Sequence, residues 1–418
     1  AAGAAAFDCV APPQPTRHGL SAMPPAHVAT RAAPTSWLLR LAQKRTEWLS
    51  NPRLHAWASQ SVFTRWLVRR RAHELFDVMA GFVHTQVLLA CLELELLPRL
   101  QHGGQSAAAL AKRYDMDTDA MTALLDSAVT LRLLRRRRDL YTLGPLATPL
   151  LAHPGIRDMV RHNALLYADM QNPLALMRQP KASGMHRFWL YTDGSNGLAH
   201  NSQDAHDWSA GSVAAYSGLM ASSQGFLREQ LLQVYPFDQH RHVMDVGGGQ
   251  GAWVGTLAAR FDRLQLTLVD LPPVAELAKQ RLTEAGLSER VRCHGMHFGK
   301  ESLPTGADLI TLLRVAHDHP DEVVRQLMQA CWQALPAGGT LLLAEPMAEQ
   351  PKGAQRVDPY YHFYLLAMGQ GRLRTAQRLA LLMSEAGFVH IESLPTPLPM
   401  HGGVVLGRKL GDKNHANT

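Results

Sequence analysis

The spacing of apolar residues along the chain changes near residue 240. Before that point, apolar side chains recur at helical intervals, first between Trp37 and about Leu97, with Pro98 as the predicted helix end. From His242 onward, short apolar runs alternate with helical segments. The runs are "HVMDV", "LQLTLVD", "RVRCHG", "ADLITLLRV", "GGTLLLAE" and "GGVVLGRK". Such alternation is typical of βα units, so we predict a helical N-terminal half followed by an α/β half with a mostly parallel sheet.

The same pattern divides the chain into domains. Residues 1–34 are rich in Ala and Pro, have no apolar periodicity and lack the features of a secretory signal, so we predict a disordered lead-in. Residues 35–155 are predicted to form a helical domain. Residues 156–235 follow as a helical connector, interrupted by a polar loop near 181–208. The α/β domain then occupies residues 236–412.

The stretch 106–145 predicts a winged helix. A short helix is followed by a second helix starting near Thr118, with Asp117 or Thr118 as its N-cap, and by a two-stranded wing through a run of arginines. The second helix carries three acids, Asp117, Asp119 and Asp126. It has no Arg, Lys, Asn or Gln before Arg132. Because a helix in the major groove needs donors for base edges and cannot present acids to phosphates, we predict no nucleic-acid partner.

The composition is that of an ordinary soluble chain, with 418 residues of which 46% are hydrophobic and 18% charged, long enough for two domains. The longest apolar stretch, residues 76–97, contains Asp77 and His84, so we interpret it as a buried helix rather than a membrane span. The four cysteines are scattered and form no CxxC pair, which indicates reduced thiols of an intracellular protein. We therefore expect a cytoplasmic location.

The net charge of +7 comes from visible basic clusters. They are "RWLVRRR" at 65–71, "RLLRRRR" at 132–138 and "GRKLGDK" near the C-terminus. Such clusters suit nucleic acid, an anionic membrane surface or simply water. The pattern by itself leaves these alternatives open.

The stretch "VMDVGGGQGAW" at 243–253 is the most informative one. An apolar strand ends near Asp245 and a helix begins at the end of the stretch. Three glycines lie between them, Gly247, Gly249 and Gly251. Glycines let a backbone approach a ligand closely, and a helix N-terminus offers free N–H groups. A nicotinamide dinucleotide, S-adenosylmethionine and no ligand are the alternatives. Asp245 would repel a pyrophosphate but suits an ammonium or sulfonium, whereas Asp270, after the next strand, suits ribose hydroxyls in either case.

The stretch "LLRVAHDHPDE" at 312–322 holds two histidines, His317 and His319, at a predicted strand end. His-x-His is compatible with half of a metal site, a catalytic base beside a bystander, or two polar residues that end a strand. A neutral imidazole takes a hydroxyl proton, and ligand crevices open at the C-terminal edge of a parallel sheet. A metal site needs further ligands, and no His/Cys cluster lies nearby in the sequence.

Four motifs, "DVGGGQG", "VDLP", "RVAHDHPDE" and "LLLAEPM", resemble in order and spacing the small-molecule O-methyltransferases, which include the caffeic acid and acetylserotonin enzymes. Segments such as "HNALLYADMQNPLALMR" and "FYLLAMGQGRLRT" are most similar to the bacterial hydroxyneurosporene (demethylspheroidene) O-methyltransferases of carotenoid synthesis. The resemblance runs from about residue 70 to 410. It implies a Rossmann-like class I methyltransferase domain preceded by an all-helical, winged-helix dimerisation domain, with S-adenosylmethionine as methyl donor.

The resemblance also assigns catalytic roles. It implies that His317 is the general base and that Glu345, at the end of the following strand, orients it. A strand-end acid that caps a loop is the alternative for Glu345. His319 stands where relatives often carry Trp, so we interpret it as a lining or surface residue. A second family glutamate falls on Leu373, which argues against a phenolic substrate.

The cofactor residues implied by the resemblance lie at or just after the predicted strand ends. They are Asp245, Gly247, Gly249, Gly251, Asp270, Leu271, Met296, Phe298 and Arg314. Relatives carry an acid near the adenine where this chain has Met296, so we expect a more apolar adenine pocket formed by Met296 and Phe298. The resemblance implies no metal.

On the substrate side, the resemblance points to Met220, Tyr364 and Met368. Tyr364 and Met368 are four residues apart, so core packing at helical spacing is the alternative. A pocket lined by Met and Tyr suits a long polyene with one hydroxyl, so we expect methylation of a hydroxylated carotenoid. C-methylation of a bacteriochlorophyll-type pigment and a winged-helix regulator that senses S-adenosylmethionine are the alternatives. A polyene must be collected from a membrane, which would give the basic clusters a peripheral contact with an anionic, photosynthetic membrane.

The apolar helix at 76–97 suggests assembly. Left alone it would expose a large apolar patch, which monomers seldom tolerate, although it could fold back onto the chain's own core. Related methyltransferases bury such helices in an intertwined homodimer. We therefore expect an obligate homodimer that buries well over ~2,000 Å².

Overall fold

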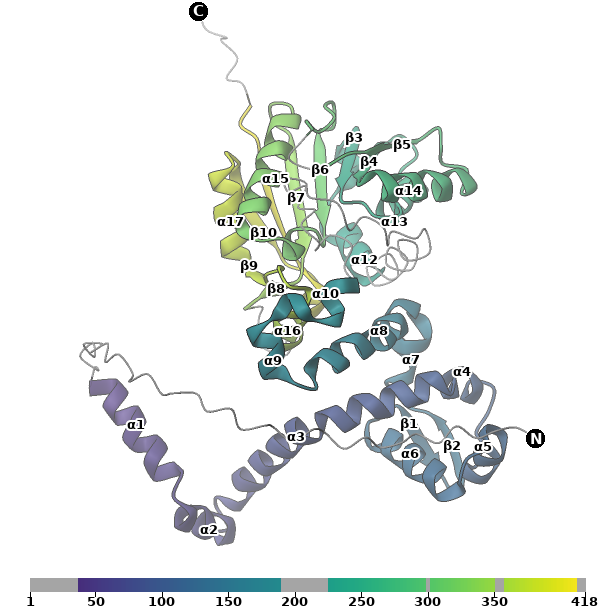
Figure 1. Ribbon diagram of the computed structural model, residues 1–418, viewed down its shortest axis with the longest axis vertical. Coiled ribbons are helices and arrows are strands. Elements are labelled where there is room, and N and C mark those ends of the chain that lie inside the picture. The colour runs from purple at the N-terminus through teal and green to yellow at the C-terminus, as the bar shows by residue number, and fades with distance from the viewer. Residues whose placement is uncertain (1–36, 189–224, 298–300, 350–356, 412–418) are drawn as a thin grey trace, which may run out of the picture. The chain divides into compact units, whose positions relative to one another are not determined.

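The computed structural model describes residues 37–188, 225–297, 301–349 and 357–411 (Figure 1). The predicted lead-in at 1–34 lies outside them. The chain divides into two compact units, residues 1–81 and 82–418. The domain boundaries expected from the sequence stay a prediction.

The first unit contains α1 (Trp37–Leu49), α2 (Pro52–Gln60) and the start of α3 (Arg65–Glu93). The start of α2 follows from its sequence. Asn51 is the N-cap, and its side-chain oxygen accepts the Arg53 N–H at 2.9 Å. Pro52 occupies the first helical position, where a missing N–H costs nothing.

Helix α3 exposes most of its apolar side chains in the single chain. Its buried residues are Cys91 and Leu92, close to its C-terminal end, whereas Phe76 and Phe82 are exposed. The expectation of a buried helix at 76–97 is therefore wrong over its first half in the single chain. The C-terminal part does pack on the chain's own core, where Cys91, Leu92, Leu96 and Leu97 are buried. By length and composition alone α3 could also cross a membrane, a test that core helices of soluble proteins pass as well.

The second unit begins with the predicted winged helix. It consists of α4 (Leu96–Leu100), α5 (Ala107–Tyr114), α6 (Thr118–Thr130) and the strands β1 (Leu134–Arg137) and β2 (Leu140–Leu143). Asp117 caps α6 by accepting the N–H groups of Asp119 and Ala120 at 2.9 Å, which confirms the predicted N-cap. Asp126 accepts the Tyr141 hydroxyl at 2.7 Å and lies 3.3 Å from Arg136, so two elements of the wing are tied to α6.

The predicted helix end at Pro98 is wrong. Helix α3 ends at Glu93, and Glu95 adopts a left-handed conformation with φ 48°. Pro98 lies within the first turn of α4, where its missing N–H breaks no helical hydrogen bond.

Helices dominate the following stretch, as predicted. They are α7 (Ala147–Ala152), α8 (Pro154–Met170), α9 (Pro173–Arg178), η1 (Pro180–Ala182) and α10 (Gly184–Phe188). The predicted polar loop at 181–208 is therefore wrong over residues 184–188, where Asp169 accepts the backbone N–H groups of Gly184 and Met185. Residues 189–208 of that loop lie outside the described residues.

A seven-stranded sheet with the order β10-β11-β7-β6-β3-β4-β5 forms the α/β domain (Figure 1). The strands are β3 (His242–Val246), β4 (Gln265–Asp270), β5 (Val291–Gly295), β6 (Leu309–Leu313), β7 (Thr340–Glu345), β10 (Val389–Leu394) and β11 (Gly403–Arg408). Neighbours from β7 to β5 pair in parallel, whereas β11 runs antiparallel to β7 and to β10. The mostly parallel sheet is confirmed; β10 was not predicted.

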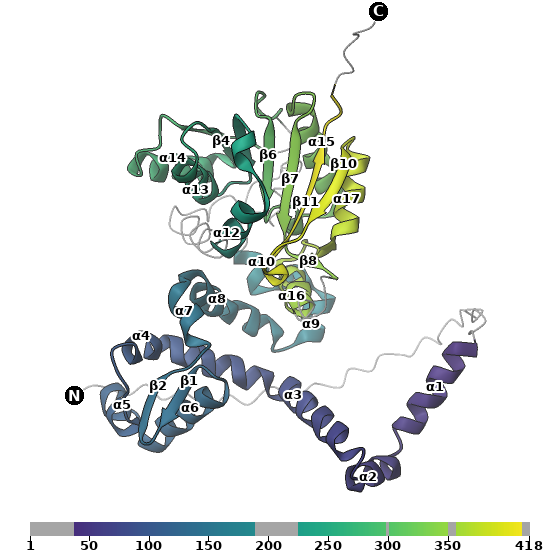
Figure 2. The ribbon, with the colours of Figure 1, turned by 180° about the vertical axis from the view of Figure 1, so that it is seen from behind.

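Helices cover both faces of the sheet (Figure 2). They are α12 (Gly225–Val234), α13 (Ala252–Arg260), α14 (Pro272–Glu284), α15 (Asp321–Ala334) and α17 (Ala376–Glu385). Helix α16 (Asp358–Met368) packs instead with residues of α8, α9 and α10. Ile310 and Leu312 of β6 join the core cluster that contains residues of α15 and α17. Leu309 and Leu313 join the cluster with residues of α12, α13 and α14. This alternation explains why a strand buried on both faces reads as a continuous apolar run.

The strand order also locates the site. From β3 the chain continues to β4 and β5 on one side, and then returns to β6 and β7 on the other side of β3. Adjacent strands whose connections leave in opposite directions open a crevice at their carboxyl ends. The glycine loop after β3 and the histidine segment after β6 meet at this point.

Candidate active site

Strand β3 ends in a buried acid. Asp245 is 1% exposed, and its Oδ1 accepts the hydroxyl of Thr311 on the neighbouring strand β6 at 2.7 Å. Burial raises the pKa of Asp245 to about 7; the Thr311 hydrogen bond opposes this rise and the charge of Asp270 adds to it. A positive ligand group at this position would favour the ionised carboxylate.

The glycine loop needs its glycines. Gly247, Gly249 and Gly251 have φ values of 74°, 56° and 80°, a region that side chains disfavour. A Cβ on Gly247 would lie 2.5 Å from a methyl group of Val315, so this glycine lets the loop after β3 pack against the segment after β6. A Cβ on Gly249 would meet nothing within 4 Å, so the loop has open space there.

The ends of β4 and β5 join the same loop. The Asp270 carboxylate accepts the Gly249 N–H and the Leu271 N–H, each at 2.7 Å. The Met296 N–H donates to the Asp270 carbonyl at 2.9 Å, and Met296 is 9% exposed. The structure therefore brings seven of the nine predicted cofactor residues to one edge of the sheet: Asp245, Gly247, Gly249, Gly251, Asp270, Leu271 and Met296. Phe298 lies outside the described residues.

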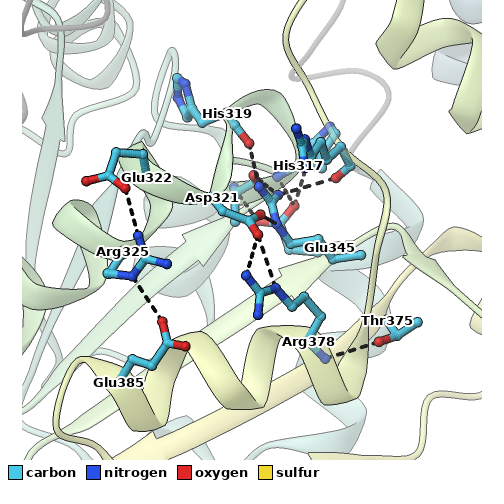
Figure 3. A network of polar contacts seen from close by, with 12 residues as sticks. His317, His319, Asp321, Glu322, Arg325, Glu345, Thr375, Arg378 and Glu385 are labelled. Carbon is cyan, nitrogen blue, oxygen red and sulfur yellow. Dashed lines mark hydrogen bonds and ion pairs between the residues drawn. The ribbon is translucent and has the colours of Figure 1, made fainter. Parts of the chain in front are cut away.

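His317 and Glu345 form a buried pair (Figure 3). His317 belongs to the short helix η4 (Ala316–Asp318) after β6, and its Nδ1 lies 2.6 Å from Oε2 of Glu345 at the end of β7. The other oxygen of Glu345 accepts the Val315 N–H at 2.9 Å and the Ala316 N–H at 2.8 Å. One carboxylate thus holds both the imidazole and the backbone that carries it.

A second carboxylate flanks the same imidazole. Nε2 of His317 lies 3.1 Å from Oδ1 of Asp318, without the geometry of a hydrogen bond. Burial raises the pKa of Asp318 to about 6; the charge of His317 opposes this rise and that of Glu345 adds to it. A positive charge on the ring would therefore be met by a carboxylate on each side.

His319 is arranged differently. In Figure 3 its imidazole points away from the pair formed by His317 and Glu345. The ring is half-buried, its Nδ1 has no hydrogen-bond partner among the described residues, and burial together with the charge of His317 lowers its pKa to about 4. Over the described ranges, no group of three or more His, Cys, Asp or Glu side chains could hold a metal ion. The half-buried ring agrees with a lining residue.

A buried arginine, which sequence reasoning missed, holds the histidine segment. Arg374, in the short strand β9 (Arg374–Thr375), donates to the carbonyls of Ala316 at 2.7 Å and His319 at 2.6 Å. Its Nε contacts Asp321 at 2.7 Å, and Asp321 also pairs with Arg378 at 2.6 Å. Because the acceptors on the histidine segment are backbone carbonyls, they left no signal in the sequence.

The predicted substrate-side residues of α16 lie in a packed cluster. Tyr364 and Met368 are 2% and 1% exposed and pack with residues of α8, α9 and α10. The Tyr364 hydroxyl lies 3.0 Å from Nε2 of His162, and the Met368 carbonyl lies 2.8 Å from Nδ1 of His186. Their role toward a substrate stays a prediction, and Met220 lies outside the described residues.

Arg314 lies close to the same cluster. Burial lowers its pKa, but the charges of Tyr361, Tyr364 and Asp318 raise it above its ordinary value. Its backbone has φ 57°, and its N–H donates to the Ala344 carbonyl at 2.9 Å. These neighbours are residues of α16 and of the histidine segment, so its predicted contact with a cofactor stays a prediction.

Comparison with known proteins identifies the family of this chain. A family model described as O-methyltransferase domain matches residues 175–389, and one described as O-methyltransferase dimerisation domain matches residues 76–153. The chain belongs to the O-methyltransferase family. The demethylspheroidene O-methyltransferase of Cereibacter sphaeroides is 39% identical over 356 residues, which cover 85% of this chain and 92% of that protein. The protein of the same name from Rhodobacter capsulatus is 35% identical, with 84% and 86% covered.

A solved structure supports the fold of this O-methyltransferase. Human N-acetylserotonin methyltransferase, in a crystal structure with SAM, matches with a TM-score of 0.67 at 22% identity, covering 81% of this chain and 98% of that one. The predicted class, a Rossmann-like methyltransferase domain preceded by a helical dimerisation domain, is confirmed. The dimerisation domain supports a homodimer.

The arrangement suits methyl transfer to a hydroxyl. In this O-methyltransferase the two strands beside β6 each end in a buried acid, Asp245 on β3 and Glu345 on β7. Asp245 suits a cationic donor, and the imidazole that Glu345 holds is of a type that suits the acceptance of a proton. The contact between Gly247 and Val315 brings the two segments together, so a donor and an acceptor bound at this edge would be held close to each other.

Proposed function

We propose that the chain transfers a methyl group from S-adenosylmethionine to a hydroxyl of a hydroxylated carotenoid. The observation that carries the proposal is the identity with the two demethylspheroidene O-methyltransferases over most of the chain. Methylation of a phenol is less well supported, because Leu373 stands where the resemblance expects a second glutamate beside the base.

The residues at the ends of β3, β4 and β5 fit the proposed cofactor. S-adenosylmethionine, when bound, supplies a methyl group activated by a sulfonium. The buried carboxyl of Asp245 would hold the cationic methionine end, while Asp270 would hold the ribose. Gly249 leaves open space beside the loop, and Met296 with its buried side chain would pack on the adenine together with Phe298. Leu271 and Arg314 complete the proposed set.

The proposed chemistry on the acceptor side needs one proton transfer. Nε2 of His317 would accept the substrate hydroxyl proton as the oxygen attacks the methyl group. Glu345 would keep the ring oriented through Nδ1 and stabilise its positive charge, a role in which an acid need not become protonated. Arg374 would act as a positioning residue, since it holds the backbone on both sides of His317.

The proposed substrate site combines apolar and polar groups. Tyr364 and Met368 would line it from α16, together with Met220 and the connector at 156–235. A polyene presents a long apolar surface, which flexible methionines accommodate. Because such a substrate has almost no solubility in water, we further propose a cytoplasmic homodimer in peripheral contact with an anionic, photosynthetic membrane. The exposed apolar face of α3 from Phe76 onward, where the match to the dimerisation domain begins, would be buried between the two copies.

A transfer assay tests this function. The purified full-length chain is given isotope-labelled S-adenosylmethionine and, in separate detergent-solubilised samples, a hydroxylated carotenoid or a bacteriochlorophyll-type pigment. We expect label in the carotenoid as an ether methyl group and none in the other pigment. Label on a carbon of the bacteriochlorophyll-type pigment, with an unlabelled carotenoid, would replace the proposed substrate while leaving the family intact.

A further inference from the structure

Four exposed tryptophans mark the N-terminal helices as an interaction surface. Trp37, Trp48, Trp57 and Trp66 are 68%, 62%, 62% and 60% exposed. They are half of the eight tryptophans in the chain, and all four lie within residues 37–75. Tryptophan is among the largest apolar side chains, and soluble proteins seldom leave several of them in water without a partner.

The same segment carries most of the net charge. Residues 37–75 contain eight Lys and Arg and two Glu, a net charge of +6, against +7 for the whole chain. All eight basic side chains are exposed: Arg40, Lys44, Arg45, Arg53, Arg65, Arg69, Arg70 and Arg71. The structure pairs Arg70 with Glu74. The rest of the molecule is therefore almost neutral, and the basic charge is concentrated where the tryptophans lie.

Helix α1 places tryptophans and basic residues side by side. Trp37, Leu41 and Trp48 are spaced by four and seven residues, so they share one face. Lys44, seven residues after Trp37 and four before Trp48, lies on that face as well, and Arg40 lies at its border. A helix with aromatic and leucine side chains on one face and basic side chains beside them lies in the interface of a membrane, where Trp is enriched and long basic side chains reach the headgroups.

Other partners fit less well. The match to the family's dimerisation domain begins at residue 76, so this segment precedes it. A second copy of the segment would bring a net +6 against a net +6, which is repulsive. Nucleic acid would attract the charge but offers no apolar phase for exposed side chains such as Leu41 and Phe63, the latter 88% exposed.

We propose that residues 37–75 form an interfacial anchor that docks on an anionic lipid bilayer. The tryptophans and leucines enter the headgroup region, and the basic side chains face the anionic headgroups. This deepens the membrane contact of the proposed function and rests on it, because a substrate dissolved in the bilayer gives the anchor its purpose. The membrane contact is thus assigned to residues 37–75 rather than to the arginines of the wing, where Arg136 is paired with Asp126.

Vesicle binding of the full-length protein tests the anchor. Vesicles of phosphatidylcholine alone are compared with vesicles that also contain phosphatidylglycerol. The variants are Trp37→Ser with Trp48→Ser, and Arg40→Glu with Lys44→Glu. A matched control, Arg135→Glu with Arg137→Glu, makes the same change of charge on the wing. We expect preference for the anionic vesicles, a loss of about tenfold or more in binding for both α1 variants, and less than about twofold for the wing control.

Three results of the binding experiments would overturn the anchor. They are unchanged binding of both α1 variants, a loss confined to the wing control, and tighter binding of single-stranded RNA than of anionic vesicles. A dimer that dissociates in the tryptophan variant would also overturn it, because the partner would then be the second copy. Methyl transfer to carotenoid in detergent micelles separates the two proposals. If the wild type transfers the methyl group in micelles but does not bind vesicles, the anchor is refuted and the proposed function stands. If the wild type binds vesicles but transfers no methyl group, the proposed function is refuted.

Discussion

The two strands that flank β6 both end in a buried acid, yet the two acids are held in different ways. On β3, the Asp245 carboxyl accepts the hydroxyl of Thr311, and burial raises its pKa to about 7. On β7, the Glu345 carboxylate accepts two backbone N–H groups and contacts the imidazole of His317. Strand order explains why acids gather at this edge. The two acids differ in the donors around them. Glu345 is held by backbone N–H groups and an imidazole of the protein, whereas a cationic ligand would favour the ionised form of Asp245.

The largest effect is expected from Glu345→Ala. It leaves the N–H groups of Val315 and Ala316 and the ring of His317 without their acceptor, and each buried donor left unpaired costs about 1–3 kcal/mol. Turnover should fall by about a thousandfold or more, because the imidazole loses its orientation and its counter-charge. Glu345→Gln is the matched control: it keeps an oxygen for the backbone and should melt well above the Ala variant while remaining poorly active. A Gln variant with wild-type turnover would mean that the charge of Glu345 is not needed.

At the β3 end, Asp245→Asn should remove a pH dependence of the stability of the fold. A carboxyl whose pKa is raised in the folded state stabilises the fold below its unfolded pKa, and that stability is lost as the pH rises through about 7. The melting temperature of the ligand-free wild type relative to the Asn variant should therefore decline from about pH 5 to pH 8. Affinity for S-adenosylmethionine should change in the opposite sense, strengthening over the same range as Asp245 ionises. A pH-independent difference between the two proteins would contradict this account of Asp245.

A smaller effect is expected from Arg374→Lys. A single ammonium cannot reach the carbonyls of Ala316 and His319 and the Asp321 carboxylate together, whereas the guanidinium does. We expect turnover to fall by about tenfold, with donor affinity unchanged and a shifted pH–rate profile. Arg378→Lys is the control, since Arg378 contacts Asp321 from a more exposed position. Equal losses in both variants would indicate general destabilisation rather than positioning of His317.

The smallest effect is expected from Tyr364→Phe. The ring stays in its packed cluster and the contact with His162 is lost, so the melting temperature should fall by a few degrees, for about 1 kcal/mol. Turnover and the KM for the carotenoid should change by less than about threefold, because the apolar lining is retained. A KM more than about tenfold higher would show that the hydroxyl contacts the substrate directly.

Much of the fold could be predicted from local patterns. Strands buried on both faces, such as β6 and β7, read as continuous apolar runs. Asp117, a residue type that favours the N-cap position, correctly predicted the start of α6. Strand β10 was missed because it is an outer antiparallel strand whose residues are exposed or half-buried, and its pairing is irregular between Val389 and Glu392. Helix α3 was misjudged because its apolar composition says that it needs a partner but not whether the partner is its own chain. The helix end predicted at Pro98 was wrong because a proline is allowed in the first turn of a new helix.

Candidate site residues could be predicted where a strand ends in a residue whose side chain can bind a ligand or transfer a proton. His317 and Glu345 are 28 residues apart, and the pairing of β6 with β7 brings them together. The resemblance to known enzymes supplied the assignment, because His-x-His alone left three interpretations open. Arg374 could not be found in this way, since it acts through backbone carbonyls, which every residue possesses.

The central claim is that His317 removes the substrate proton while the β3 end holds the donor independently. The most direct measurement compares His317→Ala with wild type in two experiments, turnover with the carotenoid and calorimetric binding of S-adenosylmethionine. His319→Ala serves as the control, since its ring points away from Glu345. We predict that His317→Ala loses about a hundredfold or more in turnover with nearly unchanged donor affinity, and that His319→Ala keeps most of its activity. Turnover of the His317→Ala protein close to wild type, with donor bound normally, would contradict the account.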